Sequence, residues 1–155
     1  MKRTPMLLTG ILLGAVSVSA AANAHTGAPA GQAARTARVG LARTSHGRIL
    51  VTASGFTLYE FSRDPRNKNT CAKVSECSGT WPPLTTSGSP VAGRGVRASL
   101  LSTIRLSGGT RQVTYAGHPL YTYASATERG ETVYIGANQF GGSWYAVNAA
   151  GGRVR

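Results

Sequence analysis

Short runs of alternating apolar and polar residues, separated by Gly, Ser and Pro, begin at Gly47 and continue almost to the C-terminus. The first two runs span residues 48–53 and 56–61, and between them stand Ser54 and Gly55. Glycine adopts the positive φ that a tight turn between antiparallel strands requires. We therefore predict that these two runs form a β-hairpin.

Later runs have the same character. Residues 99–106 predict a helical turn that continues into a strand, and residues 132–135 and 143–147 predict two further strands. The last residues, 152–155, carry no such pattern and are expected to fray. The whole pattern predicts a mainly β domain, a small sandwich or barrel in which helical structure is limited to short turns.

The hairpin pattern occurs twice, because residues 111–116 and 118–123 flank Gly117 as the earlier runs flank Gly55. At an offset of 62, the positions Val51, Thr52, Gly55, Leu58, Tyr59 and Phe61 are matched by Val113, Thr114, Gly117, Leu120, Tyr121 and Tyr123. We interpret this match as an internal duplication.

A tryptophan follows each hairpin. Trp81 comes 22 residues after Tyr59, and Trp144 comes 23 residues after Tyr121. Two copies are too few for a solenoid, so we expect each half to bury its apolar face against the other with pseudo-twofold symmetry. The predicted domain spans residues 44–151, with halves of about 44–98 and 99–151.

The N-terminal residues 1–24 are typical of a secretory signal peptide. Lys2 and Arg3 precede an apolar stretch that is too short to span a bilayer, and cleavage is expected after Ala24, with Ala20 as the alternative. Residues 25–43 are rich in Ala, Gly, Thr and Arg with few large apolar side chains, which predicts a flexible basic tether. No transmembrane segment is expected after cleavage.

Basic residues far outnumber acidic ones. Removing Lys2 and Arg3 from the 17 Lys and Arg residues leaves 15 against 5 Asp and Glu, a formal charge of +10 for the exported chain. Such a field attracts anionic partners, which outside the cell are wall polymers, the membrane surface or an envelope protein; no nucleic acid is expected. A scattered charge that serves solubility alone is the alternative.

The exported chain has two cysteines, Cys71 and Cys77. Disulfides persist outside the cytoplasm, so we expect the two thiols to be paired as a structural staple. Five residues separate them, whereas the oxidoreductase motif has two. The basic neighbours Lys68 and Lys73 would favour a thiolate, which keeps a redox role open as a second hypothesis.

Several motifs of this chain resemble the bacterial secreted-repeat proteins with the Yx4D motif, some of which are predicted lipoproteins. The resemblance rests on residues 55–64, Cys71, Cys77, residues 81–84, 112–121 and 141–147, and it covers about 49–151. It implies an exported, duplicated envelope domain of unassigned biochemical function. This sequence has Ala126 where the second half would match Asp64, which argues against a role that needs two equivalent aspartates. It also has no cysteine for lipidation, which implies a free protein.

Tyr59 and Asp64 are candidate site residues at the end of the first hairpin. In an alternating strand Tyr59 shares a face with Phe61, so both are expected to be packed. Asp64 precedes Pro65, which favours a turn in which the carboxylate accepts main-chain N–H groups. Contact with a ligand is the alternative for this pair.

The remaining candidates are aromatic: Trp81, Tyr121, Tyr123 and Trp144. We expect these rings to fill the core, because alternation directs half of the strand side chains inward. A stacking surface for sugar rings or organic groups is the alternative.

The sequence offers no recognisable catalytic set, and no cofactor or metal site is expected. We interpret the chain as a secreted, extracellular or wall-associated binding or structural module. A redox or electron-transfer accessory that uses Cys71 and Cys77 is one alternative. An enzyme of unknown type is another, and it would need a cleft lined by Asp64, Glu76 and His118.

Overall fold

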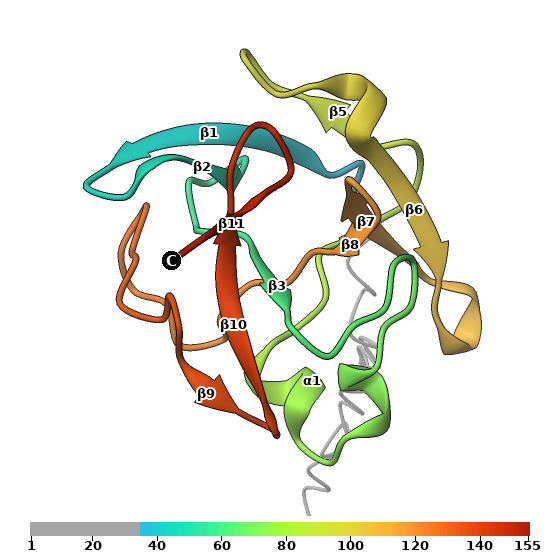
Figure 1. The fold of residues 1–155 in the computed structure, drawn as a ribbon. Helices are drawn as coiled ribbons and strands as arrows, with labels where there is room; N and C mark the ends of the chain where they lie inside the picture. Colours follow the sequence, from blue (N-terminus) through green and yellow to red (C-terminus); the bar gives the residue numbers. More distant parts are fainter. Residues whose placement is uncertain (1–34) are drawn as a thin grey trace, which may run out of the picture. The chain divides into compact units, whose positions relative to one another are not determined.

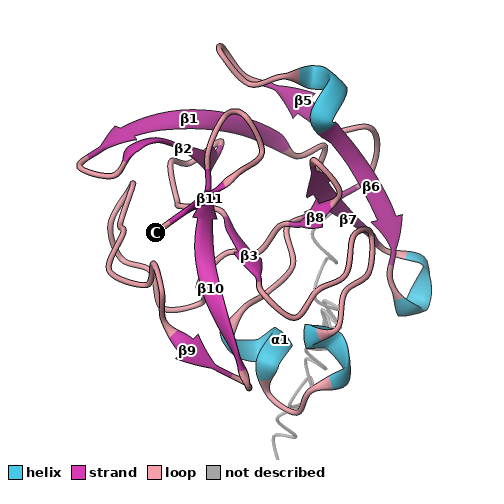
Figure 2. Ribbon diagram, viewed as in Figure 1, coloured by secondary structure: helices cyan, strands magenta, loops and turns pink. Residues whose placement is uncertain are grey.

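The computed structural model describes residues 35–155 (Figure 1). The predicted signal peptide and residues 25–34 of the predicted tether lie outside this range. Strands dominate the described residues, with one four-residue α-helix, α1 (Cys77–Thr80), and three short 3₁₀ turns (Figure 2). The mainly β class is therefore confirmed. None of the helices in this range has the length and apolar character that crossing a membrane requires.

The first sheet has the strand order β2-β1-β5. Its strands are β1 (Arg38–Thr44), β2 (Gly47–Thr52) and β5 (Val91–Ala92). The first two form an antiparallel hairpin, and β5 pairs in parallel with the other edge of β1.

The position of β1 corrects the predicted tether, because residues 38–43 belong to this strand. Val39 is fully buried and Leu41 packs against the same core cluster, so one face of β1 is apolar. The alternating residues Gly40 and Ala42 are small, and this hid the strand pattern in the sequence. The domain therefore begins before residue 44.

The second sheet has the order β11-β10-β3, with β9 attached to β10. Its strands are β3 (Tyr59–Phe61), β9 (Asn138–Gln139), β10 (Gly142–Val147) and β11 (Arg153–Val154). The strand expected at residues 143–147 is present. The expectation that residues 152–155 fray is wrong, since β11 pairs with the end of β10.

The third sheet has the order β4-β7-β6, with β8 attached to β7. Its strands are β4 (Thr85–Thr86), β6 (Leu101–Arg105), β7 (Arg111–Tyr115) and β8 (His118–Pro119). A 3₁₀ turn at Ala98–Leu100 leads into β6, as the sequence predicted for residues 99–106.

Residues 132–135 do not form the predicted strand. They make a turn in which the N–H of Ile135 donates to the carbonyl of Thr132, at 3.0 Å. Their apolar side chains have unlike surroundings: Val133 is 72% exposed, while the ring of Tyr134 packs on Trp81. A short apolar run alone did not distinguish a strand from a packed turn.

Both predicted hairpin turns form around glycines with positive φ, at 91° for Gly55 and 82° for Gly117. The first predicted hairpin is shorter than expected, because the second run returns to β2 through the bridge between Val51 and Thr57, whereas β3 pairs with β10. Isolated β-bridges then connect the sheets: Ile49 pairs with Asn148, and Tyr59 pairs with Tyr121. The first bridge joins β2 to the end of β10, and the second joins the second sheet to the segment that follows β8. The three sheets thus enclose adjoining core clusters.

Candidate functional site

Matching aromatic residues of the two halves meet in a stack of rings. Trp81 and Trp144, the matching tryptophans, lie face to face with ring centroids 4.0 Å apart and planes 6° apart. Phe61 stacks on the outer face of Trp144 at 4.4 Å, and its counterpart Tyr123 lies against Trp81 at 4.9 Å. Tyr134 extends the stack beyond Tyr123, with centroids 3.8 Å apart. 

The same symmetry holds for the edge contacts. Tyr59 meets Trp81 edge-on at 5.1 Å, and Tyr121 meets Trp144 edge-on at 5.2 Å. The rings of both tyrosines, both tryptophans and Phe61 are all within 1% of complete burial. These rings offer no open stacking surface, and only Tyr123 and Tyr134 at one end are half-buried.

The hydroxyl groups of the two matching tyrosines have different partners. Tyr121 donates to Asp64 Oδ2 at 2.5 Å, whereas Tyr59 donates to the main-chain carbonyl of Glu131 at 3.1 Å. Burial raises the pKa of both tyrosines above the ordinary value of 10.0, and the nearby charge of Asp64 raises that of Tyr121 further. Each hydroxyl is thus held protonated as a donor inside the protein.

Asp64 lies in the turn that follows β3 and is nearly buried. Its Oδ1 accepts the main-chain N–H of Thr70 at 2.7 Å and the hydroxyl of Thr70 at 2.6 Å. The carboxylate therefore connects the start of the cysteine loop to Tyr121 of the other half. The matching position holds Ala126, which is why Tyr59 finds a main-chain acceptor.

The cysteine loop is closed by the disulfide between Cys71 and Cys77. Both cysteines are completely buried and belong to the same core cluster as the ring stack. The bridge joins the 3₁₀ turn at Cys71–Lys73 to α1, directly before Trp81. The loop thereby supports one face of the aromatic core.

Sequence analysis missed a second buried carboxylate, Glu60. It points to the face of β3 opposite Tyr59, as strand alternation requires, and is completely buried. Arg153 of β11 pairs with Glu60 Oε1, and Nδ1 of His118 lies 3.3 Å from Oε2. The burial depends on β11, a two-residue strand with no sequence signature.

The three residues that an enzyme hypothesis would bring together have separate surroundings. Asp64 contacts Thr70 and Tyr121, His118 contacts Glu60, and Glu76 is exposed at the start of α1. Across residues 35–155, no group of three or more His, Cys, Asp and Glu side chains is placed to hold a metal ion.

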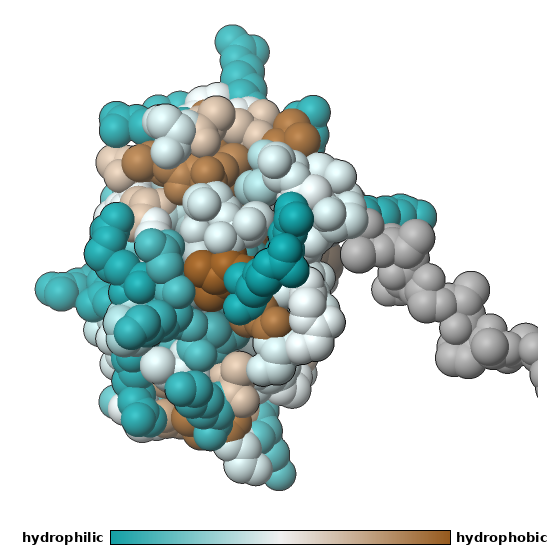
Figure 3. Space-filling view, turned by 90° about the vertical axis from the view of Figure 1, so that its right-hand side faces the viewer, coloured by the Kyte–Doolittle hydropathy of each residue, from teal (hydrophilic) through white to brown (hydrophobic). Residues whose placement is uncertain are grey.

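The surface of the described residues is strongly basic. All 15 arginines and lysines in residues 35–155 are exposed, while two of the five acids, Glu60 and Asp64, are buried. Hydrophilic side chains, teal in Figure 3, project from much of the face shown there, among smaller brown patches. Two of the five acidic side chains are therefore inside the fold, whereas all the described Arg and Lys side chains are on its surface.

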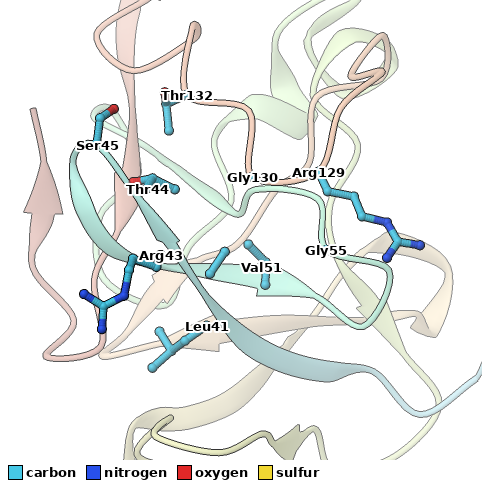
Figure 4. A pocket seen from close by; sticks show the side chains of 10 residues that line it. Leu41, Arg43, Thr44, Ser45, Val51, Gly55, Arg129, Gly130 and Thr132 are labelled. Atoms are coloured by element: carbon cyan, nitrogen blue, oxygen red, sulfur yellow. The ribbon is translucent and has the colours of Figure 1, made fainter.

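An open pocket of about 460 Å³ lies between the β1–β2 hairpin and the loop at residues 129–132 (Figure 4). Leu41, Ala42 and Val51 give it an apolar part. Arg43 and Arg129 flank it, but Figure 4 shows their guanidinium groups directed away from each other. The two charged groups at this pocket thus do not converge on a common ligand position.

Comparison with known families confirms the resemblance. Residues 40–85 and 102–148 each match the sequence model of a family described as a secreted repeat of unknown function. The two matches agree with the internal duplication, and each contains one of the two glycine turns, at Gly55 and at Gly117. No curated protein and no solved structure matches the chain. The chain belongs to the family of this secreted repeat, of which it carries two copies.

Proposed function

We propose that this protein is an exported module that binds anionic polymers or surfaces of the cell envelope through its basic exterior. The observation that carries the proposal is the unequal burial of charge. Every described Arg and Lys is exposed, whereas Glu60 and Asp64 are inside the fold. A surface of this kind concentrates polyanions and speeds their association.

The buried ionisable groups support a binding role rather than a catalytic one. Glu60 and Asp64 each contact side chains from distant parts of the chain and so hold strands and loops together. The completely buried cysteines favour a structural disulfide over one that exchanges with thiols, because exchange requires access for an attacking thiolate.

Retention on isolated cell-wall material tests the proposal. The exported protein, purified from culture medium, is applied to wall fragments at increasing salt. We expect retention at about 0.05 M salt and release by about 1 M, because the Debye length falls to about 3 Å at 1 M. Wall fragments from which the anionic polymers have been extracted serve as the control matrix.

Two results would contradict the proposal. The first is a protein that washes through at every ionic strength. The second is equal retention on extracted and intact wall fragments, which would assign binding to uncharged wall components.

A further inference from the structure

We infer that each repeat carries a phosphate-binding site formed by two arginines that face each other across its hairpin. In the first repeat Arg43 of β1 lies directly opposite Arg48 of β2. In the second repeat Arg105 of β6 lies directly opposite Arg111 of β7. This inference rests on the proposed function and names the ligand chemistry and the residues.

Both pairs lie near the end of a two-stranded hairpin. Arg43 and Arg105 are 62 residues apart, which is the offset of the duplication, whereas Arg48 and Arg111 are 63 apart. The arginines on the second strands of the two hairpins therefore differ by one position in register. The second pair comes directly before its turn, and the pair Thr44–Gly47 separates the first pair from its turn. All four arginines are exposed. Residues paired across two strands project from the same face of a sheet. Each hairpin thus projects two arginine side chains from one face.

Like charges directly opposite each other destabilise a sheet, so these pairs are not explained by the stability of the fold. A neighbouring carboxylate could offset the repulsion. Within residues 35–155, however, the only ion pairs closer than 4.0 Å are those of Glu60 with Arg153 and His118. Neither arginine pair has an acidic partner there.

Guanidinium groups are suited to phosphate, because their planar N–H donors bind two phosphate oxygens at once. A phosphate group between two opposed arginines accepts hydrogen bonds from both and replaces their repulsion by attraction. Near the first pair the main chain carries a third arginine, Arg94. Arg48 Nη1 lies 3.9 Å from the position that a Cβ would take at Gly95, and Arg94 adjoins this glycine.

Titration calorimetry with inorganic pyrophosphate tests the sites in the exported protein. We expect two pyrophosphates per chain for the wild type. The double variant Arg43→Gln with Arg48→Gln should keep only the site of the second repeat, and Arg105→Gln with Arg111→Gln only the site of the first. The quadruple variant should keep neither site. At each lost site we expect the affinity for pyrophosphate to fall about tenfold or more. The charge-matched control, Arg38→Gln with Arg97→Gln, removes two exposed arginines from outside the pairs and keeps two sites.

Thermal unfolding separates binding from folding. Removing either pair should leave the melting temperature equal or raise it, because repulsion is relieved. A lower melting temperature in both pair variants but not in the control would show that the arginines serve the fold, and would overturn the inference.

The calorimetry and the wall-retention experiment together distinguish failure of this inference from failure of the proposed function. If the control loses as much pyrophosphate binding as the pair variants, or if the quadruple variant keeps both sites, the paired sites are wrong while salt-dependent retention on wall fragments still stands. If wall retention fails but the stoichiometry follows the pairs, only the proposed function is wrong. The source of the phosphate is identified by comparing the wild type with the quadruple variant. Tighter binding of the wild type to soluble polyphosphate would identify a polymer, and tighter binding to vesicles of phosphatidylglycerol would identify a lipid headgroup.

Discussion

Tyr59 and Tyr121, the matching residues of the two repeats, exchange both of their main-chain hydrogen bonds, each N–H donating to the other's carbonyl at 2.9 Å. The pseudo-twofold axis therefore passes between them. On their other sides Tyr59 pairs with Ala146 of the second repeat, and Tyr121 pairs with Pro83 of the first. The tryptophan segment of each repeat thus completes the hairpin of the other, and neither repeat contains its full set of partners.

Trp81→Ala and Trp144→Ala should each lower the free energy of unfolding by about 3–5 kcal/mol, because each removes a fully buried ring from the central stack. Urea unfolding followed by circular dichroism measures the loss. The exposed Val133→Ala is the control and should change stability by less than about 0.5 kcal/mol. Since the rings touch, the double variant should lose less than the sum of the single losses. A loss below about 1 kcal/mol for either tryptophan would contradict this account.

Asp64→Ala should cost about 1–3 kcal/mol, because it leaves the buried hydroxyl of Tyr121 and the N–H of Thr70 without their acceptor. A double-mutant cycle with Tyr121→Phe isolates the contact between the two side chains. We expect the double variant to be less destabilised than the two single losses predict when added. Strict additivity would show that the hydroxyl and the carboxylate are energetically independent.

Stability should fall above about pH 10. The pKa values of Tyr59 and Tyr121 are raised in the folded protein above the ordinary 10.0, so the unfolded chain loses these protons first. Their contribution is intact below pH 10 and is lost as the pH rises above it, by up to about 1.4 kcal/mol per pH unit for each group. Urea unfolding at pH 9, 10 and 11 measures the slope. Tyr59→Phe and Tyr121→Phe should each flatten it, and an unchanged slope in both would argue against this assignment.

Arg153→Gln should destabilise the protein by about 2 kcal/mol, because it leaves the buried carboxylate of Glu60 with His118 as its remaining partner. The cost stays below the roughly 3–5 kcal/mol of a wholly buried pair, since Arg153 is partly exposed to water. Arg155→Gln, two residues further on, is the matched control. Equal stability of the two variants would mean that β11 contributes nothing to holding Glu60.

Replacing Cys71 and Cys77 by serine should lower the free energy of unfolding by roughly 2.4 kcal/mol, the chain-entropy value for a loop of this size. Because both cysteines are buried, dithiothreitol should reduce the folded protein far more slowly than the urea-unfolded protein. A structural bridge is expected to have a reduction potential below about −300 mV. A higher potential with rapid reduction of the folded protein would favour the redox hypothesis instead.

The duplicated hairpins could be predicted because their turns need glycine and their strands alternate, so Gly55 and Gly117 align the two halves. The offset also placed the tryptophans in equivalent positions. Strand alternation places Glu60 on the face of β3 opposite Tyr59, but it gives only the face on which a side chain lies. It does not say whether another strand covers that face, and so the partners of Glu60 remained hidden.

The missed elements are those whose stability comes from distant partners. β1 presents small residues between Val39 and Leu41, and β11 has only two residues, so each depends on pairing with a neighbouring strand. The apolar residues at 132–135 suggested a strand. In the structure they form a turn, and the ring of Tyr134 packs against Trp81 from a distant part of the chain. The pairing of each hairpin with the tryptophan segment of the other repeat has no signature in the sequence. The hairpin residues would be the same if the neighbouring strand came from their own repeat.

The exchange of segments between repeats also bears on how the chain reaches its destination. Contacts such as that between Tyr59 and Tyr121 join residues 62 positions apart, and long sequence separation slows folding. β3 of the first repeat cannot pair with β10 until the second repeat has emerged from the ribosome or from the export channel. We therefore expect the second sheet of this chain to form only after its last strands have been exported.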